Sequence, residues 1–325
     1  MFHMKVILAI VAIAVLAGAA GAQVSIGGAQ SLYIQPGARP AGMGDCFVAI
    51  ADDASGVFWN PAGLAFMKGD MGFILLHSQL VPDWGDVYYE YAAYAQRIEG
   101  LGTVGGSLTY LTYGEQQGTD DEGELTVKFD SYEVIPSIAY GVPIGDNLAA
   151  GINLKFIWVD LAPSEATFGQ GEGVGTTFGG DVGILYTTDR LNLGGAVQHI
   201  GPRIAYIDEE QADPLPRNLK LGAAYRLLND EMNEFTLVAE YEKSLVIYED
   251  FLNQATGVIL HGGAEYRYYD LLAFRAGYVH DPDGDVMDFS FGMGLNYKNW
   301  AFDFASIPQA EGLKRPFRLS FTGTF

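Results

Sequence analysis

The feature that most constrains the fold of this chain is an alternation of apolar and polar residues, which recurs in segments of about ten residues bounded by Gly, Pro, Asn or Asp. In the C-terminal segment RPFRLSFTGTF, Phe317, Leu319 and Phe321 share one face of an extended chain, and Arg318 and Ser320 share the other. Helical periodicity is hard to find after residue 70. The pattern predicts fourteen strands, near residues 70–80, 86–98, 101–114, 124–142, 147–161, 176–187, 190–200, 217–228, 233–245, 258–268, 271–280, 287–297, 299–307 and 315–325.

The connections between these strands fall into two alternating groups. One group is short, namely EGL, PIGDN, TTDR, NDEM, YYD and YKN, and the other is mostly longer, for example GEQQGTDDEGE and GPRIAYIDEEQADPLP. A membrane-spanning barrel has short periplasmic turns and longer outer loops, and an even number of strands brings both ends of its wall to one side. A β-sandwich gives no reason for this order. We therefore predict an all-β fold, a 14-stranded antiparallel transmembrane β-barrel.

The two faces of the strands also suit a barrel wall. In MDFSFGMGLNY, Phe289, Phe291 and Met293 would face lipid and Ser290 the interior. Charged residues of both signs fall on the polar faces of other strands, which predicts a wet, partly ion-paired lumen: Lys155, Asp181, Lys220, Arg226, Glu240, Glu242, Glu265, Arg267, Arg275, Asp303 and Arg318. Aromatic residues near strand ends suit interfacial girdles, although cross-strand pairs would look similar: Tyr88, Tyr89, Tyr91, Tyr94, Tyr266, Tyr268, Tyr269 and Trp300.

The N-terminus indicates export. Residues 1–22 contain Lys5, an apolar run and a small-residue ending, Ala20-Gly21-Ala22, which predicts a signal peptide cleaved before Gln23. No later apolar run is long enough for a transmembrane helix. The bacterial outer membrane is therefore the expected location, and a soluble exported β protein is the alternative. Cys46 is the single cysteine and is expected to be a small buried residue.

Residues 23–69 precede the predicted wall, which occupies residues 70–325. Within DDASGVFWNPAGLAF, Asn60 can cap a helical turn that Pro61 begins, and Asp52, Asp53 and Ser55 offer an earlier cap. These signals predict short helices that form a hatch inside the barrel, or alternatively a capped helix beneath its mouth. The aromatic residues of the hatch are candidate contacts for a hydrophobic ligand: Phe47, Phe58, Trp59 and Phe66.

No catalytic or nucleic-acid-binding pattern is visible. The net charge of -22 disfavours phosphate binding, and there is no G-x-S-x-G elbow. His77, His199, His261 and His280 lie on separate predicted strands, so we expect neither an enzyme nor a cofactor.

One loop is a weak calcium candidate. HDPDGDVMD holds Asp281, Asp283 and Asp285, like the start of a calcium loop, but its Gly is misplaced and position twelve would be Gly292 instead of Glu. An Asp-Pro-Asp-Gly turn between two strands explains the same residues.

Residues 31–66, SLYIQPGARPAGMGDCFVAIADDASGVFWNPAGLAF, resemble the N-terminal signature of the PorV/PorQ family, a branch of the FadL-like outer-membrane proteins. The resemblance implies a fourteen-stranded outer-membrane barrel whose N-terminal segment folds into or under the lumen. The matching hatch residues are Arg39, Gly42, Met43, Gly44, Asp52, Asp53, Trp59, Asn60, Pro61 and Gly63, with apolar residues 47–50 and Ala54, Ala62 and Leu64 beside them.

The resemblance also implies two functions. FadL-like proteins pass long-chain fatty acids or other hydrophobic compounds through the barrel, whereas PorV-like proteins serve the type IX secretion system and receive the C-terminal signal domains of exported proteins. We expect the secretion role, with cargo docking at the acidic outer loops, and keep hydrophobic uptake and a structural barrel or passive pore as alternatives. A pocket lined by the four aromatic residues would favour uptake, and a wide, empty lumen with ordered loops would favour secretion.

Overall fold

The computed structural model describes residues 27–82, 85–120, 123–167, 171–246, 257–310 and 312–325. The predicted signal peptide lies outside these residues. No helix among them is long and apolar enough to cross a membrane.

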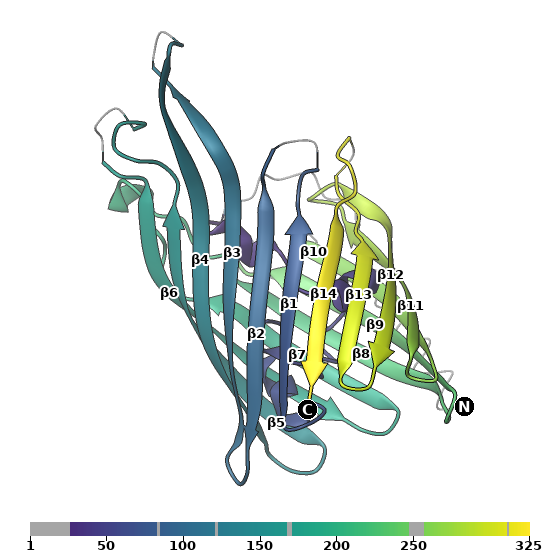
Figure 1. Cartoon of the computed structure of the whole chain (residues 1–325). Coiled ribbons are helices and arrows are strands. Elements are labelled where there is room, and N and C mark those ends of the chain that lie inside the picture. The colour runs from purple at the N-terminus through teal and green to yellow at the C-terminus, as the bar shows by residue number, and fades with distance from the viewer. Residues whose placement is uncertain (1–26, 83–84, 121–122, 168–170, 247–256, 311) are drawn as a thin grey trace.

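The described residues contain fourteen strands, each antiparallel to its neighbours, and β1 pairs with β14 to close the barrel (Figure 1). The predicted barrel is thus confirmed, and the described strands do not form a β-sandwich. The bounds are β1 Met71–Gln79, β2 Tyr88–Ile98, β3 Gly102–Thr119, β4 Leu125–Pro143, β5 Leu148–Asp160, β6 Val174–Thr187, β7 Leu191–Ile200, β8 Asn218–Asn229, β9 Asn233–Ser244, β10 Val258–Tyr268, β11 Leu272–Asp281, β12 Val286–Tyr297, β13 Trp300–Ser306 and β14 Phe317–Thr324.

One predicted loop is largely strand. The segment GEQQGTDDEGE was expected to connect β3 and β4, but β3 continues to Thr119 and pairs with β4 as far as Leu125. The pairing shifts register after Thr112 and again after Gln117, where bulges bend the two strands. The connection is therefore a long hairpin that rises above the rest of the rim at the top of Figure 1.

Alternation along the strands produces an apolar outer surface. On β12, Phe289, Phe291 and Met293 are 54%, 56% and 56% exposed, whereas Ser290 is fully buried. In the predicted girdle, Tyr94, Tyr268, Tyr269 and Trp300 are exposed. Tyr89 and Tyr91 are not part of it, because they have the opposite parity on β2 and are buried inside the barrel.

Residues 27–68, which we call the plug, lie inside the barrel and not beneath its mouth. Their expected short helices are present as η1 Gln30–Tyr33, α2 Ala38–Gly42, α3 Gly56–Trp59 and η2 Pro61–Phe66. Helix α2 packs against β11 to β14, and η2 packs against β3 to β6 on another part of the wall. One further short helix, η3 Glu209–Gln211, lies in the loop between β7 and β8.

The plug joins the wall at the seam where the barrel closes. The backbone N–H groups of Asp70 and Met71 both donate to the carbonyl oxygen of Phe325, at 2.6 and 3.0 Å, and the Phe325 N–H donates back to Met71 at 2.8 Å. The first residues of the wall are therefore bonded to the last residue of the chain.

Glycines on nine strands let backbone or side-chain atoms of the plug approach the wall closely. A Cβ placed on any of them would lie less than 3.0 Å from an atom of the plug, a distance that real side chains do not tolerate without displacement. We call this set the glycine belt. Its members are Gly105, Gly141, Gly151, Gly183, Gly194, Gly222, Gly263, Gly277 and Gly292. The belt accounts for part of the unusual glycine content, 42 residues in the chain.

Two adjacent glycines of β10 provide a matched test of this packing. A Cβ on Gly263 would press against Met43, whereas a Cβ on Gly262 would meet nothing within 4 Å. We expect Gly263→Ala to lower the stability of the barrel by about 1–3 kcal/mol, the usual cost of overpacking. Gly262→Ala should leave it nearly unchanged. Thermal unfolding in detergent measures both, and equal midpoints for the two variants would contradict the close contact.

Candidate functional site

The predicted helix cap of the plug is confirmed at Asn60. Its side-chain oxygen accepts a hydrogen bond from the Ala62 N–H at 3.1 Å, and Pro61 occupies the first position of η2. The Asn60 amide donates to the carbonyls of Val48, at 2.9 Å, and of Ile184 on β6, at 3.1 Å. One side chain thus caps a turn, holds a second segment of the plug and ties both to the wall.

The predicted earlier helix cap does not form, because no side chain caps α3. Asp53 makes a turn before the helix instead: its Oδ1 accepts hydrogen bonds from the backbone N–H and the hydroxyl of Ser55, at 2.8 and 2.5 Å. This turn and the Asn60 cap fold DDASGVFWNPAGLAF into consecutive turns that fit inside the lumen.

Wall side chains provide hydrogen-bond partners for the plug backbone. Glu240 accepts from the N–H groups of Phe47 and Val48 at 2.9 and 3.0 Å. Gln198 donates to the carbonyl of Phe58 at 2.6 Å. Buried backbone groups away from water need such partners, and strands and turns alone do not supply them here. Further bonds of this kind come from Glu133, Ser290, Ser320, Tyr89 and Arg97.

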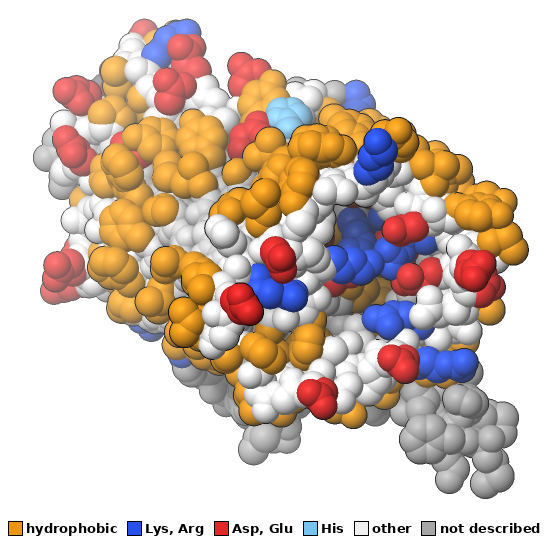
Figure 2. Space-filling view, turned by 60° about the horizontal axis from the view of Figure 1, so that its bottom comes forward, with side chains coloured by type: hydrophobic (Ala, Val, Ile, Leu, Met, Phe, Trp, Pro, Cys, Tyr) orange, Lys and Arg blue, Asp and Glu red, His pale blue; other side chains and the backbone are white. Residues whose placement is uncertain are grey.

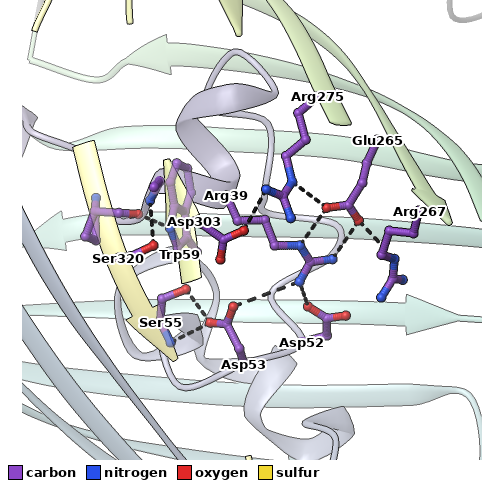
Figure 3. A network of polar contacts seen from close by, with 12 residues as sticks. Arg39, Asp52, Asp53, Ser55, Trp59, Glu265, Arg267, Arg275, Asp303 and Ser320 are labelled. Carbon is purple, nitrogen blue, oxygen red and sulfur yellow. Dashed lines mark hydrogen bonds and ion pairs between the residues drawn. The ribbon is translucent and has the colours of Figure 1, made fainter. Parts of the chain in front are cut away.

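A charge network centred on Arg39 fastens the plug to β10 (Figure 3). Arg39 donates through Nε and Nη2 to the two oxygens of Glu265, at 3.0 and 3.1 Å, and through Nη1 to Asp52 at 2.6 Å. Glu265 also accepts from Arg275 at 2.6 Å, and Arg275 donates to Asp303 at 2.7 Å. We call these five residues the Arg39 latch. It links α2 to three strands, β10, β11 and β13, and to the turn before α3.

The charges of the latch shift the pKa values of two adjacent acids in the plug, Asp52 and Asp53, in opposite directions. Burial lowers the pKa of Arg39, but Asp52 and Glu265 outweigh this and hold the pKa well above its usual value. Burial would raise the pKa of Asp52, yet Arg39 and Lys68 lower that pKa to about 2. Burial and the neighbouring Asp52 charge raise the pKa of Asp53. Asp52 is therefore the stabilised anion of the pair, and Asp53 is ionised at a cost.

The charged residues predicted to face the lumen are paired there, but the lumen is not wet at the level of the plug. Lys220 contacts Glu240 and Glu242 at 3.2 and 2.6 Å, and Lys155 contacts Asp181 at 2.8 Å. All five side chains are buried, because the plug covers them. The two ammonium groups also lie over plug aromatic rings, Lys220 over Trp59 and Lys155 over Phe58. Arg267, Arg275, Asp303 and Arg318 form ion pairs as well, and Arg226 donates to a carbonyl in a short turn.

The four aromatic ligand candidates do not line one pocket. Phe47, Phe58 and Trp59 are at most 5% exposed, and both phenyl rings meet the indole edge to face, with centroids 5.8 Å apart. The Trp59 indole N–H donates to the Pro36 carbonyl at 2.9 Å. The three rings therefore fill the lumen as a packed core. Phe66 lies apart from them, at a cavity below the plug.

The remaining hatch residues hold the turns of the plug. Met43 is fully buried, and Gly42 packs against Gly292. Gly44 has a φ of 71°, in the region that favours glycine, and it also belongs to a close contact with β11. A side chain on Gly63 would collide with the backbone of Ala51.

Two cavities open on the side of the short turns, below the plug. Their volumes are about 300 and 240 Å³, and both are lined by Arg39, Asp52, Lys68 and Arg267. Figure 2 shows this end of the molecule, where basic and acidic side chains gather in a hollow. The Arg39 latch thus lies between these two cavities and the buried core of the plug.

The loop between β7 and β8 closes the opposite side. Ile204 and Leu215 are buried and pack with Leu32 of η1 and Ile157 of β5. The Tyr206 hydroxyl accepts a hydrogen bond from the Ala29 N–H at 3.1 Å. The beginning of the plug is therefore covered from the outside.

The calcium candidates serve a turn. Asp281 Oδ1 accepts from the Gly284 N–H at 2.9 Å, Asp283 accepts from the Gly257 N–H, and Asp285 has a left-handed φ of 54°. Within the described part of the chain, no group of three or more His, Cys, Asp or Glu side chains has an arrangement that could hold a metal ion.

Sequence reasoning missed the latch and the glycine belt. The charges of Glu265, Arg275 and Asp303 were expected to face the lumen. The plug residue that bonds Glu265 is Arg39, which lies 226 residues away in the chain. The sequence did contain a signal for the glycine belt. Several strand positions that face inward carry Gly where a polar residue would be expected.

Comparison with known proteins gives one family and one group of folds. The family described as type IX secretion system protein PorV matches residues 19–249. No curated protein matches the chain. Among solved structures, the Ralstonia pickettii toluene transporter TbuX is 15% identical with a TM-score of 0.58, over 89% of this chain and 98% of that one. A deletion mutant of the monoaromatic hydrocarbon channel TodX is 14% identical with a TM-score of 0.61, over 89% and 99%. A Pseudomonas aeruginosa FadL homologue is 13% identical with a TM-score of 0.52, over 94% and 100%. At these identities the structures share the fold.

Removal of the latch arginine tests its role in holding the plug. We expect Arg39→Ala to destabilise the protein by about 1.5–3 kcal/mol, the usual worth of hydrogen bonds to charged groups, since buried Glu265 loses its bidentate partner but keeps Arg275. The variant should also conduct ions in planar bilayers, and Arg39→Lys should fall between it and the wild type. Lys128→Ala, which breaks an exposed ion pair with Glu115, is the control and should change neither quantity. An Arg39→Ala protein that conducts no ions and is as stable as the wild type would exclude a role of Arg39 in fastening the plug.

The two adjacent acids should respond oppositely to neutralisation. The folded pKa of Asp52 lies below its ordinary value of 3.8, so its ionised form stabilises the fold above that pH and the contribution is lost as the pH falls towards 2. Asp52→Asn should therefore lower stability at pH 7 by about 2 kcal/mol.

The folded pKa of Asp53 is raised, so its ionised form costs stability once the pH exceeds that pKa. Asp53→Asn keeps the acceptor for Ser55 and should raise stability at pH 7, with a gain that shrinks as the pH falls towards 3.8. Unfolding midpoints across this pH range measure both variants. Shifts of the same sign at pH 7 would refute the assignment.

Proposed function

Since the chain belongs to the family described as type IX secretion system protein PorV, we propose that this outer-membrane β-barrel hands over exported proteins at the outer membrane as a component of type IX secretion. We also propose that residues 1–22 are a cleaved signal peptide, residues 23–69 the hatch and residues 70–325 the barrel. The proposal includes no enzymatic activity and no cofactor. Its partners are outer-membrane lipid, type IX components and the exported proteins.

The observation that carries this proposal is the closed lumen, although neither criterion drawn from the sequence is met. The four aromatic residues do not line one pocket, which would have favoured uptake, and the lumen is filled by the plug instead of being wide and empty, which would have favoured secretion. The plug contacts the wall through the glycine belt on nine strands, and it is fastened by the Arg39 latch. Three buried aromatic residues fill its centre. A folded protein cannot pass a lumen that the described residues of the plug fill in this way. This arrangement supports a role in which cargo is received at the outer surface, at the acidic loops, and does not travel through the barrel.

Deletion of the gene tests the proposal. We expect exported proteins to disappear from the cell surface and to accumulate inside the outer membrane, because the receiving barrel is absent. Proteomics of shaved cell surfaces measures the loss, and the wild-type gene should restore it. Complementation with Gly262→Ala, whose added methyl group meets nothing, is the matched control for a substituted chain. Normal surface proteins in the deletion strain would reject the secretion role.

A second candidate function is uptake of hydrophobic compounds, and one irregularity of the wall favours it. The pairing of β4 with β5 runs through Val134 and Trp158 and resumes only at Ser137 and Lys155. Pro136 lies in this gap, has no N–H to donate and is exposed on the outer surface. A space of about 10 Å³ lies on the inner side, lined in part by Phe58 and Ile135.

The space at the gap has room for about one water molecule, so in this second function the wall would have to open there for a hydrophobic molecule to pass between the plug and the bilayer. The similar solved structures include a toluene transporter and a hydrocarbon channel. The same deletion strain separates the two functions. If surface proteins are normal and uptake of long-chain fatty acids or toluene falls, the barrel serves uptake. A passive pore is tested by liposome swelling with sugars, since the plugged barrel should admit none.

A further inference from the structure

The hairpin formed by the outer parts of β3 and β4 has two edges that pair with no neighbouring strand among the described residues. The pairing of β3 with β2 ends at Thr112, and the pairing of β4 with β5 begins only at Tyr132. Between these points, residues 113–120 and 123–131, which we call the upper hairpin, pair with each other from Glu115 opposite Asp130 to Thr119 opposite Leu125. In the part of the chain that the structure describes, its outer edges therefore lack strand partners, and such edges are templates for another strand.

A groove lies at the base of the upper hairpin. Its volume is about 360 Å³, and its lining combines apolar groups with polar ones: Tyr113, Gln116, Gln117, Phe129, Ser131 and Leu161. Tyr113 and Phe129 come from the two strands of the hairpin, and Leu161 follows the end of β5. A strand added along the hairpin would bring alternate side chains to this groove, as strand-addition complexes do.

The charge of the upper hairpin indicates what kind of strand it would accept. Its described residues carry four acids, Glu115, Asp120, Glu124 and Asp130, and one base, Lys128. The base is engaged with Glu115 at 2.5 Å. A second copy of this chain would bring a hairpin of the same sign and is disfavoured, whereas a basic segment is attracted.

We propose that the upper hairpin binds an extended segment of another polypeptide by strand addition, with Lys or Arg side chains near its acids and an apolar side chain in the groove. The identity of that polypeptide as an exported protein rests on the proposed function. Binding of a basic strand to the hairpin does not rest on that function. The binding site and the secretion role can therefore fail separately.

Peptide binding to the purified full-length chain in detergent tests the proposal. The probe is a short fluorescent peptide of alternating lysine and valine, read by anisotropy. Two altered peptides separate the contributions: an alternating glutamate and valine peptide reverses the charge, and a lysine and valine peptide with N-methylated valines keeps the charge but loses backbone donors. We expect the first probe to bind and each altered peptide to bind about tenfold more weakly or not at all.

Two protein variants with the same loss of charge locate the site. The triple variant Glu115→Gln, Glu124→Gln and Asp130→Asn removes three negative charges from the hairpin. The control Asp208→Asn, Glu209→Gln and Glu210→Gln neutralises three acids on another loop of the same face, where they cap and form η3. We expect the hairpin variant to bind the probe about tenfold more weakly and the control to bind like wild type. Replacement of residues 114–130 by Asn-Gly, which joins the paired strands by a tight turn, should abolish binding.

Three results would overturn the proposal: equal weakening by both triple variants, full binding of the N-methylated peptide, or full binding by the shortened hairpin. The same shortened chain, placed in the deletion strain, connects the site to secretion. If the deletion itself leaves surface proteins normal while the peptide still binds the hairpin, the secretion role fails and the binding site stands. If deletion abolishes export, and the shortened chain both restores export and binds the peptide, the secretion role stands and the proposed binding site fails.

Discussion

The structure depends on one constraint: a chain segment placed inside a barrel must satisfy its backbone polar groups away from water. The plug contains short helices and turns, which leave many N–H and C=O groups without partners of their own. The wall supplies the missing partners. Glu240 accepts two consecutive N–H groups, and Gln198 donates to a carbonyl. The polar inner face of the barrel is therefore matched to a particular peptide backbone and not to solvent.

Close approach and charge pairing follow from this match. Side chains can reach the plug backbone only where the wall comes near it, and the glycine belt permits that distance. Covering the wall then removes its charged residues from water, which is costly unless each finds a partner of opposite sign. The buried pairs of Lys220, Lys155 and Arg275 meet this requirement. Arg39 meets it across the boundary between plug and wall, which is why it holds the two together.

The wall was predictable from the sequence and the plug contacts were not. Period-two alternation and turn residues are local signals, and they located all fourteen strands, with the extension of β3 to Thr119 as the main miss. The Asn60 cap was predictable for the same reason, because it acts two residues away on Ala62. The bond between Arg39 and Glu265 joins residues far apart in the chain, and no local pattern specifies which inward charge meets which hatch residue. The aromatic residues were recognised as a group, but their burial as a core depended on the wall around them.

The bonds between Asp70, Met71 and Phe325 couple two properties of the molecule. They lie where the interior segment passes into β1, which is also the strand that receives β14 to close the cylinder. Separation of these two edge strands would therefore also loosen the end of the interior segment, so the closure of the wall and the filling of the lumen depend on each other.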